Sequence, residues 1–455
     1  MTLIEQFAAI IANTRFEDLP AEVIETSKER FLDSLAALVA GYRDWHLTDS
    51  FLTYCRQSNG SVETIGCPYG LSVPEAGMAF ATIAAAGELD DGHKNAGVHC
   101  GAIATATALA AYRDSSACIQ DVLTGYVFCY EVMYRLACEM SKDIIARGAY
   151  PTSILGGFGT VALASCMYRL SEKQIADALG IVSMLSSGMM EVIHNTPEIK
   201  GLLVGKAVQN GLQAVQLVMA GIPGPHTGLD GKAGLFQILS PNVDTAIILQ
   251  GFGQTFHIRD TYTKLYPTCR HTHGAIEATA ELAAENGIAA EDVASLNVGV
   301  YKVAMNLTGN HLHPKDKGEA KFSLHYCAAT AIVQHGVSMA DLTMEAIASP
   351  KIWKLSEKVN VTMDPELEDK YPMHRGTKVT VQTKDGRIFQ KECFQLKGSP
   401  EKPISLEGIE KKLKANAVGL LPPSQINLLI DTVKNLEQDD SLTIIQGLLT
   451  KIKKV

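Results

Sequence analysis

The sequence predicts a mainly α-helical protein in which a smaller α+β domain is inserted into a large all-helical domain. Runs with apolar residues at helical spacing fill the chain up to about residue 260. Segments with the period-two, β-branched pattern of strands appear only after about residue 265, and helical runs return after Gly398-Ser399-Pro400. We therefore expect a helical domain over residues 1–264, an α+β lid domain over 265–398, and a tail over 399–455 that rejoins the helical domain.

The predicted helices of the first domain combine apolar spacing with start signals. Pro20 opens one of them at its first turn, and Ser171 caps another. Two runs, 79–86 and 102–111, are too uniformly apolar for a solvated face, so we expect them inside a helical bundle or against a partner chain. The predicted helices are 3–12, 21–40, 73–86, 102–112, 120–140, 152–167, 172–187 and 200–219.

The inserted domain alternates strands with helices. Lys384-Asp385-Gly386 joins the last two predicted strands and is a typical hairpin turn. The predicted strands are 293–303, 359–363, 378–383 and 387–394, and the predicted helices are 274–285, 322–335 and 344–348. The tail should add helices over 405–415, 423–435 and 441–451.

Composition excludes several classes of protein. The net charge is -9, with no long run of Lys or Arg, which argues against nucleic-acid binding. The first residues lack the basic segment of a secretory signal, and no apolar stretch is long enough to span a membrane. The ten cysteines form no CxxC pair, which disfavours disulfides and zinc ribbons. We expect a soluble cytoplasmic protein.

The most informative segment is a glycine-broken loop over residues 87–101, between two of the apolar helices. It carries three carboxylates, two imidazoles and a lysine. Charged groups beside a dry core must be paired or used, because an unpaired buried charge costs several kcal/mol. Glu88, Asp91 and His99 are the candidates that this loop offers, and Asp91 is favoured narrowly over Asp90.

A second polar segment, residues 264–273, also precedes an Ala-rich helix. It contributes Lys264, Cys269, Arg270, His271 and His273. Cationic groups at a helix start favour an anion. Two such segments far apart in the chain suggest a site for an anionic small molecule.

Five motifs, in order along nearly the whole chain, resemble the MmgE/PrpD family. This family includes 2-methylcitrate dehydratases, cis-aconitate decarboxylases and an iminodisuccinate epimerase. The motifs are His99-Cys100-Gly101-Ala102, Tyr150-Pro151-Thr152, Lys200 with 201–211, 264–273, and 321–326. The resemblance implies a helical domain with a smaller α+β lid, a homodimer, an active site between the domains, no metal and no organic cofactor.

The sequence departs from decarboxylase-type members at three of these positions. Those members resemble this chain but have aspartate at the position of Glu88 and histidine at the positions of Tyr150 and Cys269. Glu88 keeps the charge, whereas the other two changes remove imidazoles from the expected pocket. The family resemblance therefore does not fix the substrate.

The reactions of the family stabilise negative charge beside a carboxylate while a proton moves at an adjacent carbon. Five cationic groups could bind a small carboxylate substrate, namely Lys200, Lys264, Arg270, His271 and His273.

Proton transfer needs an acid and a base that work near neutral pH. We expect His99, or a lysine with a lowered pKa, to act as the base, and Tyr150 or Tyr326 to donate a proton. Glu88 and Asp91 would orient His99. Cys269 is expected to line the pocket and not to act as a nucleophile.

The most consistent hypothesis is a lyase that needs no cofactor, a dehydratase of a small di- or tricarboxylic hydroxy acid. An epimerase of an amino- or imino-dicarboxylate and a cis-aconitate type decarboxylase are the alternatives. A metal protein using the pairs His271/His273 and His311/His313, and a non-catalytic helical binding protein, are the remaining hypotheses.

Overall fold

The computed structural model describes residues 1–93, 95–438 and 440–453, and the chain divides into two compact units. The helical unit comprises Met1–Thr263 and Ser405–Val455, and the α+β unit comprises Lys264–Ile404. The predicted fold class, mainly α with a smaller α+β part, is confirmed. Within the described ranges, no helix combines the length and the apolar character that crossing a membrane requires.

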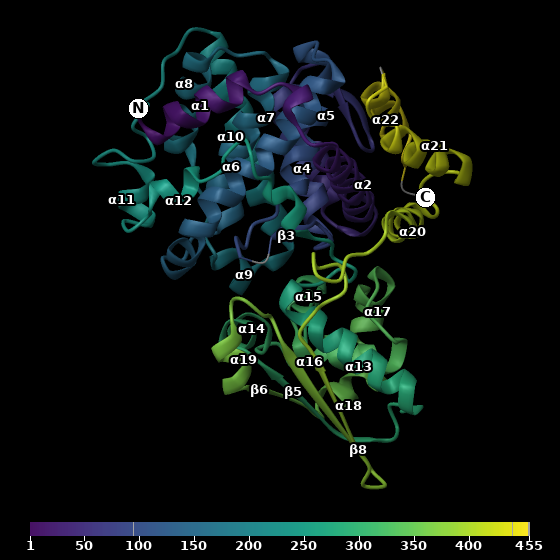
Figure 1. Cartoon of the computed structure of the whole chain (residues 1–455). Helices are drawn as coiled ribbons and strands as arrows, with labels where there is room; N and C mark the ends of the chain where they lie inside the picture. The colour runs from purple at the N-terminus through teal and green to yellow at the C-terminus, as the bar shows by residue number, and fades with distance from the viewer. Residues whose placement is uncertain (94, 439, 454–455) are drawn as a thin grey trace. The chain divides into compact units, whose positions relative to one another are not determined.

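Long helices build the helical unit (Figure 1). Small residues let their backbones approach closely. A Cβ atom at Gly205 would lie 2.6 Å from the carbonyl oxygen of Met78, so glycine is needed where α10 meets α4. The helices of the first segment are α1 (Leu3–Asn13), α2 (Ala21–Asp44), α3 (Thr48–Cys55), α4 (Val73–Ala86), α5 (Gly101–Ser115), α6 (Ile119–Ala146), α7 (Pro151–Met167), α8 (Glu172–Leu185), α9 (Glu191–Asn195), α10 (Lys200–Met219), α11 (Leu235–Leu239) and α12 (Thr245–Leu249).

The two uniformly apolar runs are buried, as predicted. Every residue of 79–86 and of 102–111 is buried, because α4 packs on α2, α5 and α10, and α5 packs on α7. Both helices that flank the polar loop over 87–100 are therefore internal. Their burial surrounds the charged loop with apolar packing.

The expectation that the first 260 residues are free of strands was wrong. A hairpin joins β1 (Val62–Thr64) to β2 (Cys67–Leu71), and β3 (Gly92–His93) pairs antiparallel with β4 (Thr261–Tyr262). Strands of two to five residues are too short to produce a readable alternation. The β3–β4 pair is important for the site because it joins the polar loop to a distant segment of the chain. Gly92 pairs with Tyr262, 170 residues later, and His93 pairs with Thr261, 168 residues later.

The tail packs against the helical unit through α20 (Leu406–Ala417), α21 (Pro423–Lys434) and α22 (Ser441–Leu449). Helices α20 and α21 contact α2, and α22 contacts α5. The side-chain amide of Gln446 donates to the carbonyl oxygen of Leu109 at 2.5 Å. The last helices of the chain thus complete the unit that the first helices begin.

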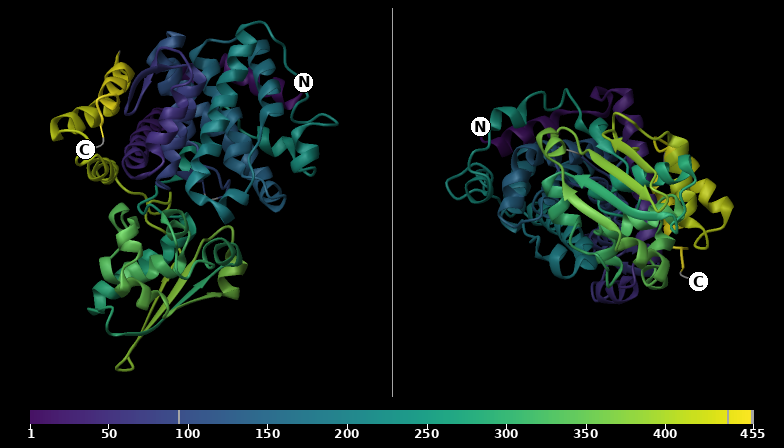
Figure 2. Two further views of the ribbon diagram at one scale, coloured as in Figure 1. Left: turned by 180° about the vertical axis from the view of Figure 1, so that it is seen from behind. Right: turned by 90° about the horizontal axis from the view of Figure 1, so that it is seen from below.

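The α+β unit contains a four-stranded sheet with strand order β6-β5-β7-β8 (Figure 2). Strands β5 and β6 run parallel, whereas β7 is antiparallel to both β5 and β8. The strands are β5 (Val293–Val300), β6 (Val359–Met363), β7 (Thr377–Thr383) and β8 (Ile388–Cys393). The helices are α13 (His273–Asn286), α14 (Lys302–Thr308), α15 (Lys317–Lys321), α16 (Leu324–Gln334), α17 (Met344–Ile347), α18 (Pro350–Ser356) and α19 (Pro365–Lys370).

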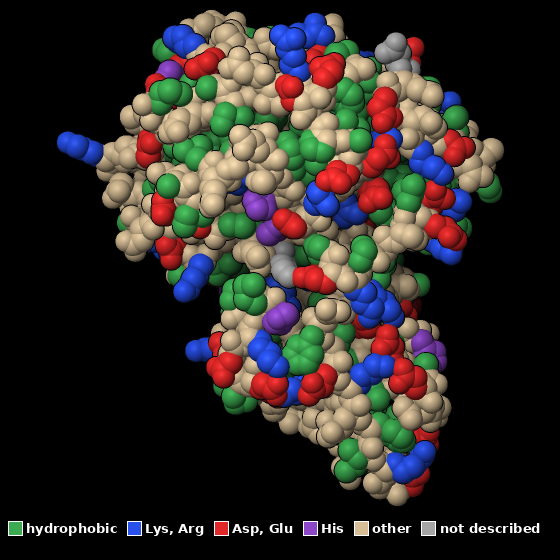
Figure 3. Space-filling model, viewed as in Figure 1, with side chains coloured by type: hydrophobic (Ala, Val, Ile, Leu, Met, Phe, Trp, Pro, Cys, Tyr) green, Lys and Arg blue, Asp and Glu red, His purple; other side chains and the backbone are tan. Residues whose placement is uncertain are grey.

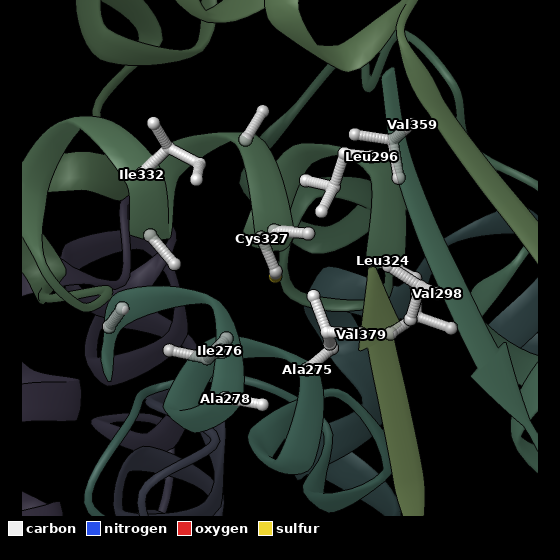
Figure 4. Close-up of a cluster of buried hydrophobic side chains, with 14 of the residues drawn as sticks. Ala275, Ile276, Ala278, Leu296, Val298, Leu324, Cys327, Ile332, Val359 and Val379 are labelled. Carbon is white, nitrogen blue, oxygen red and sulfur yellow. The ribbon is translucent and has the colours of Figure 1, made fainter. Parts of the chain in front are cut away.

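The core of the α+β unit forms where α13 and α16 pack beside the sheet (Figure 4). In β7, Val379 and Val381 are buried, and in β5 Leu296 and Val298 are buried. Ile276 of α13 and Cys327 of α16 belong to the same cluster. The apolar residues that alternate along these strands therefore lie on one face of the sheet, and that face is buried.

Positive and negative side chains are interspersed on the surface of each unit, on the face that Figure 3 shows. In the α+β unit, Lys391 pairs with both Glu281 and Glu285, and Lys378 pairs with Asp364 and Glu366.

Candidate functional site

Glu88 begins the polar loop in a strained backbone conformation. Helix α4 ends at Ala86, and Glu88 adopts φ 54°, in the left-handed region that glycine usually occupies at a helix end. Its amide donates to the carbonyl oxygen of Ala85 at 3.2 Å. A strained non-glycine residue persists only when its surroundings hold it, and such residues concentrate at functional sites.

Glu88 and Lys200 form a buried ion pair between the end of α4 and the start of α10. Both side chains are only 7% exposed. Burial by itself would lower the pKa of Lys200, but Glu88, Tyr150 and Asp90 together outweigh it and the pKa lies well above the usual value. Lys200 therefore keeps its proton near neutral pH and is a fixed positive charge.

Tyr150 lies beside this ion pair. The Lys200 ammonium is 5.6 Å from the centre of the Tyr150 ring. The Tyr150 hydroxyl is buried, and its interaction with the Thr152 side chain falls outside normal hydrogen-bond geometry, so no described residue satisfies it. Burial raises the pKa of this phenol and Lys200 offsets the rise only in part, so the hydroxyl stays protonated at neutral pH. An unsatisfied buried hydroxyl is costly to keep, which points to a ligand that satisfies it.

His99 lies at the other end of the loop, immediately before α5. Its Nδ1 atom is 2.5 Å from the carbonyl oxygen of Asp91 and 3.6 Å from the carboxylate of Asp90. Its backbone amide donates to the hydroxyl of Thr152, at the start of α7, at 3.3 Å. Both the ring and the backbone of His99 are thus held by neighbouring segments.

Asp91 plays a different part from the one predicted. Its carboxylate accepts from the Gly101 amide at 2.8 Å and from the Tyr130 hydroxyl at 2.7 Å. Only its backbone carbonyl contacts His99, and the carboxylate near that ring belongs to Asp90. The carboxylate near the ring is therefore that of Asp90 and not that of the narrowly favoured Asp91, because loop geometry and not spacing decides which side chain turns toward the ring. The catalytic role of Asp91 stays a prediction.

The Asp91 carboxylate is fully buried, and burial raises its pKa to about 6 although Arg30 opposes the rise. A Cβ atom at Gly101 would lie 2.9 Å from this carboxylate, so the start of α5 needs glycine here. Asp91 fixes the start of α5 and, through it, the position of the preceding His99.

The second predicted polar segment, residues 264–273, lies in the α+β unit and includes His271. The His271 Nδ1 atom is hydrogen-bonded to the Tyr301 hydroxyl, and the Tyr301 ring stacks on Tyr371 at 4.5 Å. Burial, followed by the positive charges of Arg375, Lys264 and Arg270, lowers the pKa of His271 well below its usual value. His271 is therefore neutral in a positive environment that suits an anion.

Arg270 and His273 also serve the local structure. The Arg270 guanidinium donates to the carbonyl oxygen of Lys397, to the Ser399 hydroxyl at 2.7 Å, and lies 3.1 Å from the His273 ring. These contacts tie the start of α13 to the segment after β8. His273 itself is the first residue of α13 and is buried.

Cys269 and Tyr326 have the surroundings of core residues. The Cys269 amide donates to the carbonyl oxygen of Lys321 at 2.9 Å. The Tyr326 ring belongs to the apolar cluster of the α+β unit, and its hydroxyl donates to the carbonyl oxygen of Asp341.

The two HxH pairs do not form a cluster with metal-ligand geometry among the described residues. His311 lies 3.7 Å from Glu319, whereas His313 lies 3.6 Å from Glu357 and stacks on Trp353. The cluster that has such geometry is a different one: His93, His257 and Asp260.

The hydrogen bonding of His93 does not suit a metal. Its Nδ1 atom accepts backbone N–H bonds from Asn95 at 3.3 Å and from Ala96 at 3.1 Å. A neutral imidazole has one acceptor nitrogen, so its Nε2 atom carries the proton. Metal-binding histidines instead donate from the nitrogen that does not hold the metal. Lys94, which follows His93, lies outside the described residues.

Sequence reasoning missed several residues that hold the site. Thr152 was noted only as part of a motif, while Asp90 was ranked below Asp91 and Arg375 was not noted. Lys412 of α20 reaches the carbonyl oxygen of Leu89, inside the polar loop, at 2.8 Å. A lysine on an otherwise ordinary amphipathic helix gives no sequence signal for this role.

A cavity of about 470 Å³ in the helical unit lies away from these residues. Arg15, Cys118, Ser165 and Arg169 are among its lining residues. None of the predicted site residues lines it.

Two family models together match most of the chain. The MmgE/PrpD N-terminal domain matches residues 5–247, and the MmgE/PrpD C-terminal domain matches residues 266–438. A cis-aconitate decarboxylase of Homo sapiens is 27% identical, and the match covers 98% of this chain and 94% of the relative. The corresponding protein of Mus musculus is 24% identical over 98% of this chain and 93% of its own. A cis-aconitate decarboxylase of Aspergillus terreus is 22% identical over 96% and 94%.

Proposed function

Because the chain belongs to the MmgE/PrpD family, we propose that it is a lyase of a small di- or tricarboxylate, and that it dehydrates a hydroxy acid. The observation that carries the proposal is the buried Tyr150 hydroxyl, which has no hydrogen-bond partner among the described residues and lies beside the protonated Lys200. The names of the relatives support a lyase of a carboxylate. The choice of dehydration comes from the acid and base that the helical unit offers.

His99 is the proposed base. Its Nδ1 atom faces the Asp91 carbonyl oxygen, which can only accept, so a neutral ring holds its proton on Nδ1. The Nε2 atom then has the lone pair that can remove a proton from carbon. The Asp90 carboxylate, 3.6 Å from Nδ1, stabilises the imidazolium that results.

Tyr150 is the proposed acid. A departing hydroxide needs a proton, and a phenol whose pKa is raised by burial holds its proton until the leaving group requires it. Lys200 stabilises the phenolate that remains, because its ammonium lies near the same ring. The proton would return from solvent or from His99 after the product leaves.

Lys200 is proposed to stabilise negative charge and not to act as a base. Its raised pKa, which follows from the pairing with Glu88, keeps it positive throughout. Because Lys200 is already charged and held in place, its surroundings need not rearrange when negative charge develops on the substrate carbon beside a carboxylate. Lys264 and the neutral His271 of the α+β unit belong to a cation-rich segment that we propose binds a substrate carboxylate.

Decarboxylation is the second candidate, because the curated relatives that match are cis-aconitate decarboxylases. It would use Lys200 and a proton donor but would release carbon dioxide in place of water. Epimerisation of an amino- or imino-dicarboxylate would use the same proton removal without a leaving group. The three reactions differ in their products, so one set of assays separates them.

The test is to incubate the protein with 2-methylcitrate, citrate, cis-aconitate and an iminodicarboxylate. Dehydration would raise the ultraviolet absorbance of an unsaturated acid, decarboxylation would release carbon dioxide, and epimerisation would incorporate solvent deuterium. Unsaturated product from a hydroxy acid, lost in Tyr150→Phe, supports the proposal. Carbon dioxide release without any dehydration would replace it with the second candidate.

Two further variants test whether the departures from decarboxylase-type members set the reaction. Tyr150→His and Cys269→His each introduce an imidazole at a position where decarboxylase-type members have histidine. A gain of carbon dioxide release from cis-aconitate in either variant, or in both combined, would support this view. No gain would contradict it. Light scattering of the wild-type protein tests the homodimer that we also propose.

A further inference from the structure

Lys412 connects three segments of the helical unit that are far apart in the sequence. Its ammonium lies 2.6 Å from the carboxylate of Asp33 on α2 and donates to the carbonyl oxygen of Leu89 at 2.8 Å. The Lys412 side chain is 7% exposed, and that of Asp33 is fully buried. Such an ion pair holds a buried lysine in place, because moving the ammonium away would separate two buried charges.

The carbonyl that Lys412 binds belongs to the residue between Glu88 and Asp90. On its other side, the loop is fixed by the Glu88 amide, which donates to Ala85. The left-handed conformation of Glu88 is unfavourable for a residue with a side chain, so contacts on both sides are needed to keep it. Lys412 provides the contact on the C-terminal side of Glu88.

We propose that Lys412 is a positioning residue, which holds Glu88 and Asp90 of the polar loop in place through its hydrogen bond to Leu89 and its ion pair with Asp33. The last helices of the chain would then be part of the site machinery and not only packing. This proposal rests on the proposed function for its effect on turnover, but its effect on the loop can be measured without any substrate.

The same helix interface offers a matched control. The Asn416 side chain, one turn along α20, donates to the carbonyl oxygen of Ala36 on α2 at 3.2 Å and is also buried. Asn416→Ala therefore weakens the contact between α20 and α2 without touching the polar loop. Any effect that Lys412→Met shows beyond that of Asn416→Ala belongs to the loop contact or to the charge.

A second variant separates the loss of the hydrogen bond to Leu89 from the effect of the Asp33 charge that a single Lys412 substitution leaves behind. Lys412→Met leaves the buried Asp33 carboxylate without its lysine and could prevent folding. The double variant Asp33→Asn, Lys412→Met removes both charges, which is often neutral for stability, yet it still lacks the bond to Leu89. Circular dichroism would confirm that it folds.

The experiment is amide hydrogen exchange, read by mass spectrometry on peptides spanning residues 86–93. We expect exchange at the Glu88 amide to be about tenfold faster in the double variant than in wild type, and unchanged in Asn416→Ala. With an active substrate, kcat should fall about tenfold to a hundredfold while KM changes little. Exchange in the double variant equal to that in Asn416→Ala would overturn the proposal. If no carboxylate is turned over by the wild type, the proposed function fails, and the exchange result still decides the role of Lys412.

Discussion

The Nδ1 atom of His99 lies 2.5 Å from the backbone carbonyl oxygen of Asp91, so a main-chain atom and not a carboxylate makes the shorter contact with this ring. A carbonyl oxygen has no protonation state of its own, so it holds the ring in one tautomer over a wide pH range. The nearby Asp90 carboxylate adds charge at 3.6 Å without being required for the tautomer.

The first prediction follows from this contact. In His99→Asn, the side-chain amide can still donate to the Asp91 carbonyl oxygen, but the base is absent. Turnover should therefore fall at least about a hundredfold, with little change in thermal stability. Near-native kcat in this variant would remove His99 from the mechanism.

The second prediction concerns Tyr150. Tyr150→Phe keeps the ring beside Lys200 and removes a hydroxyl that no described residue satisfies. Stability should be unchanged or higher by up to about 1 kcal/mol, whereas turnover should fall about a hundredfold. Urea unfolding and steady-state kinetics on the same preparation check both parts. A marked loss of stability would show that the hydroxyl serves the fold.

The third prediction concerns the Glu88–Lys200 pair. Glu88→Gln and Lys200→Met should each destabilise the protein by about 3–5 kcal/mol, because each leaves one buried charge without its partner. The double variant should be closer to wild type than either single variant. The control is Lys411→Met, in an exposed pair with Glu407, which should leave the free energy of unfolding almost unchanged. Additive losses in the double variant would contradict the coupling.

The fourth prediction uses the raised pKa of Asp91, about 6 in the folded protein. The folded state binds a proton here at a higher pH than the unfolded chain, whose carboxyl titrates near 3.8. The contribution of Asp91 to stability therefore increases as the pH falls from about 7 through 6 toward 4. Asp91→Asn removes this titration. The stability of the variant relative to wild type should therefore decline as the pH falls from about 7 toward 4. Parallel urea-unfolding curves for the two proteins would contradict the shift.

The fifth prediction uses His226, which bridges Glu5 of α1 and Asp177 of α8 at 3.0 and 3.1 Å. The hydrogen bond to Glu5 raises the pKa of His226, burial opposes the rise, and Asp177 adds to it. The stabilisation is fully present below about pH 6.5, the pKa of an unfolded histidine, and is lost as the pH rises through the higher folded value. The stability advantage of wild type over His226→Gln should shrink between about pH 6 and pH 9. An advantage that stays constant would contradict the bridge.

The fold class could be predicted from local patterns, because the helical period of 3.6 and the strand period of 2 depend only on which nearby residues are apolar. The burial of α4 and α5 could be predicted in the same way, since uncharged helices have no stable place in water. The gathering of charged groups in the polar loop was also readable, and so was the family resemblance, because its motifs are local. These features are properties of short segments.

Which groups in the polar loop contact each other depends on the folded chain as a whole. Asp90 and Asp91 are adjacent in the sequence, yet one carboxylate lies near His99 and the other bonds Gly101 and Tyr130. The two-residue strand that joins His93 to Thr261, and the reach of Lys412 to Leu89, connect positions more than a hundred residues apart. Contacts of this kind depend on how helices pack and on the side chains available at each packed surface. A local pattern carries no information about them, and that is why the orientation of each functional group had to be seen in three dimensions.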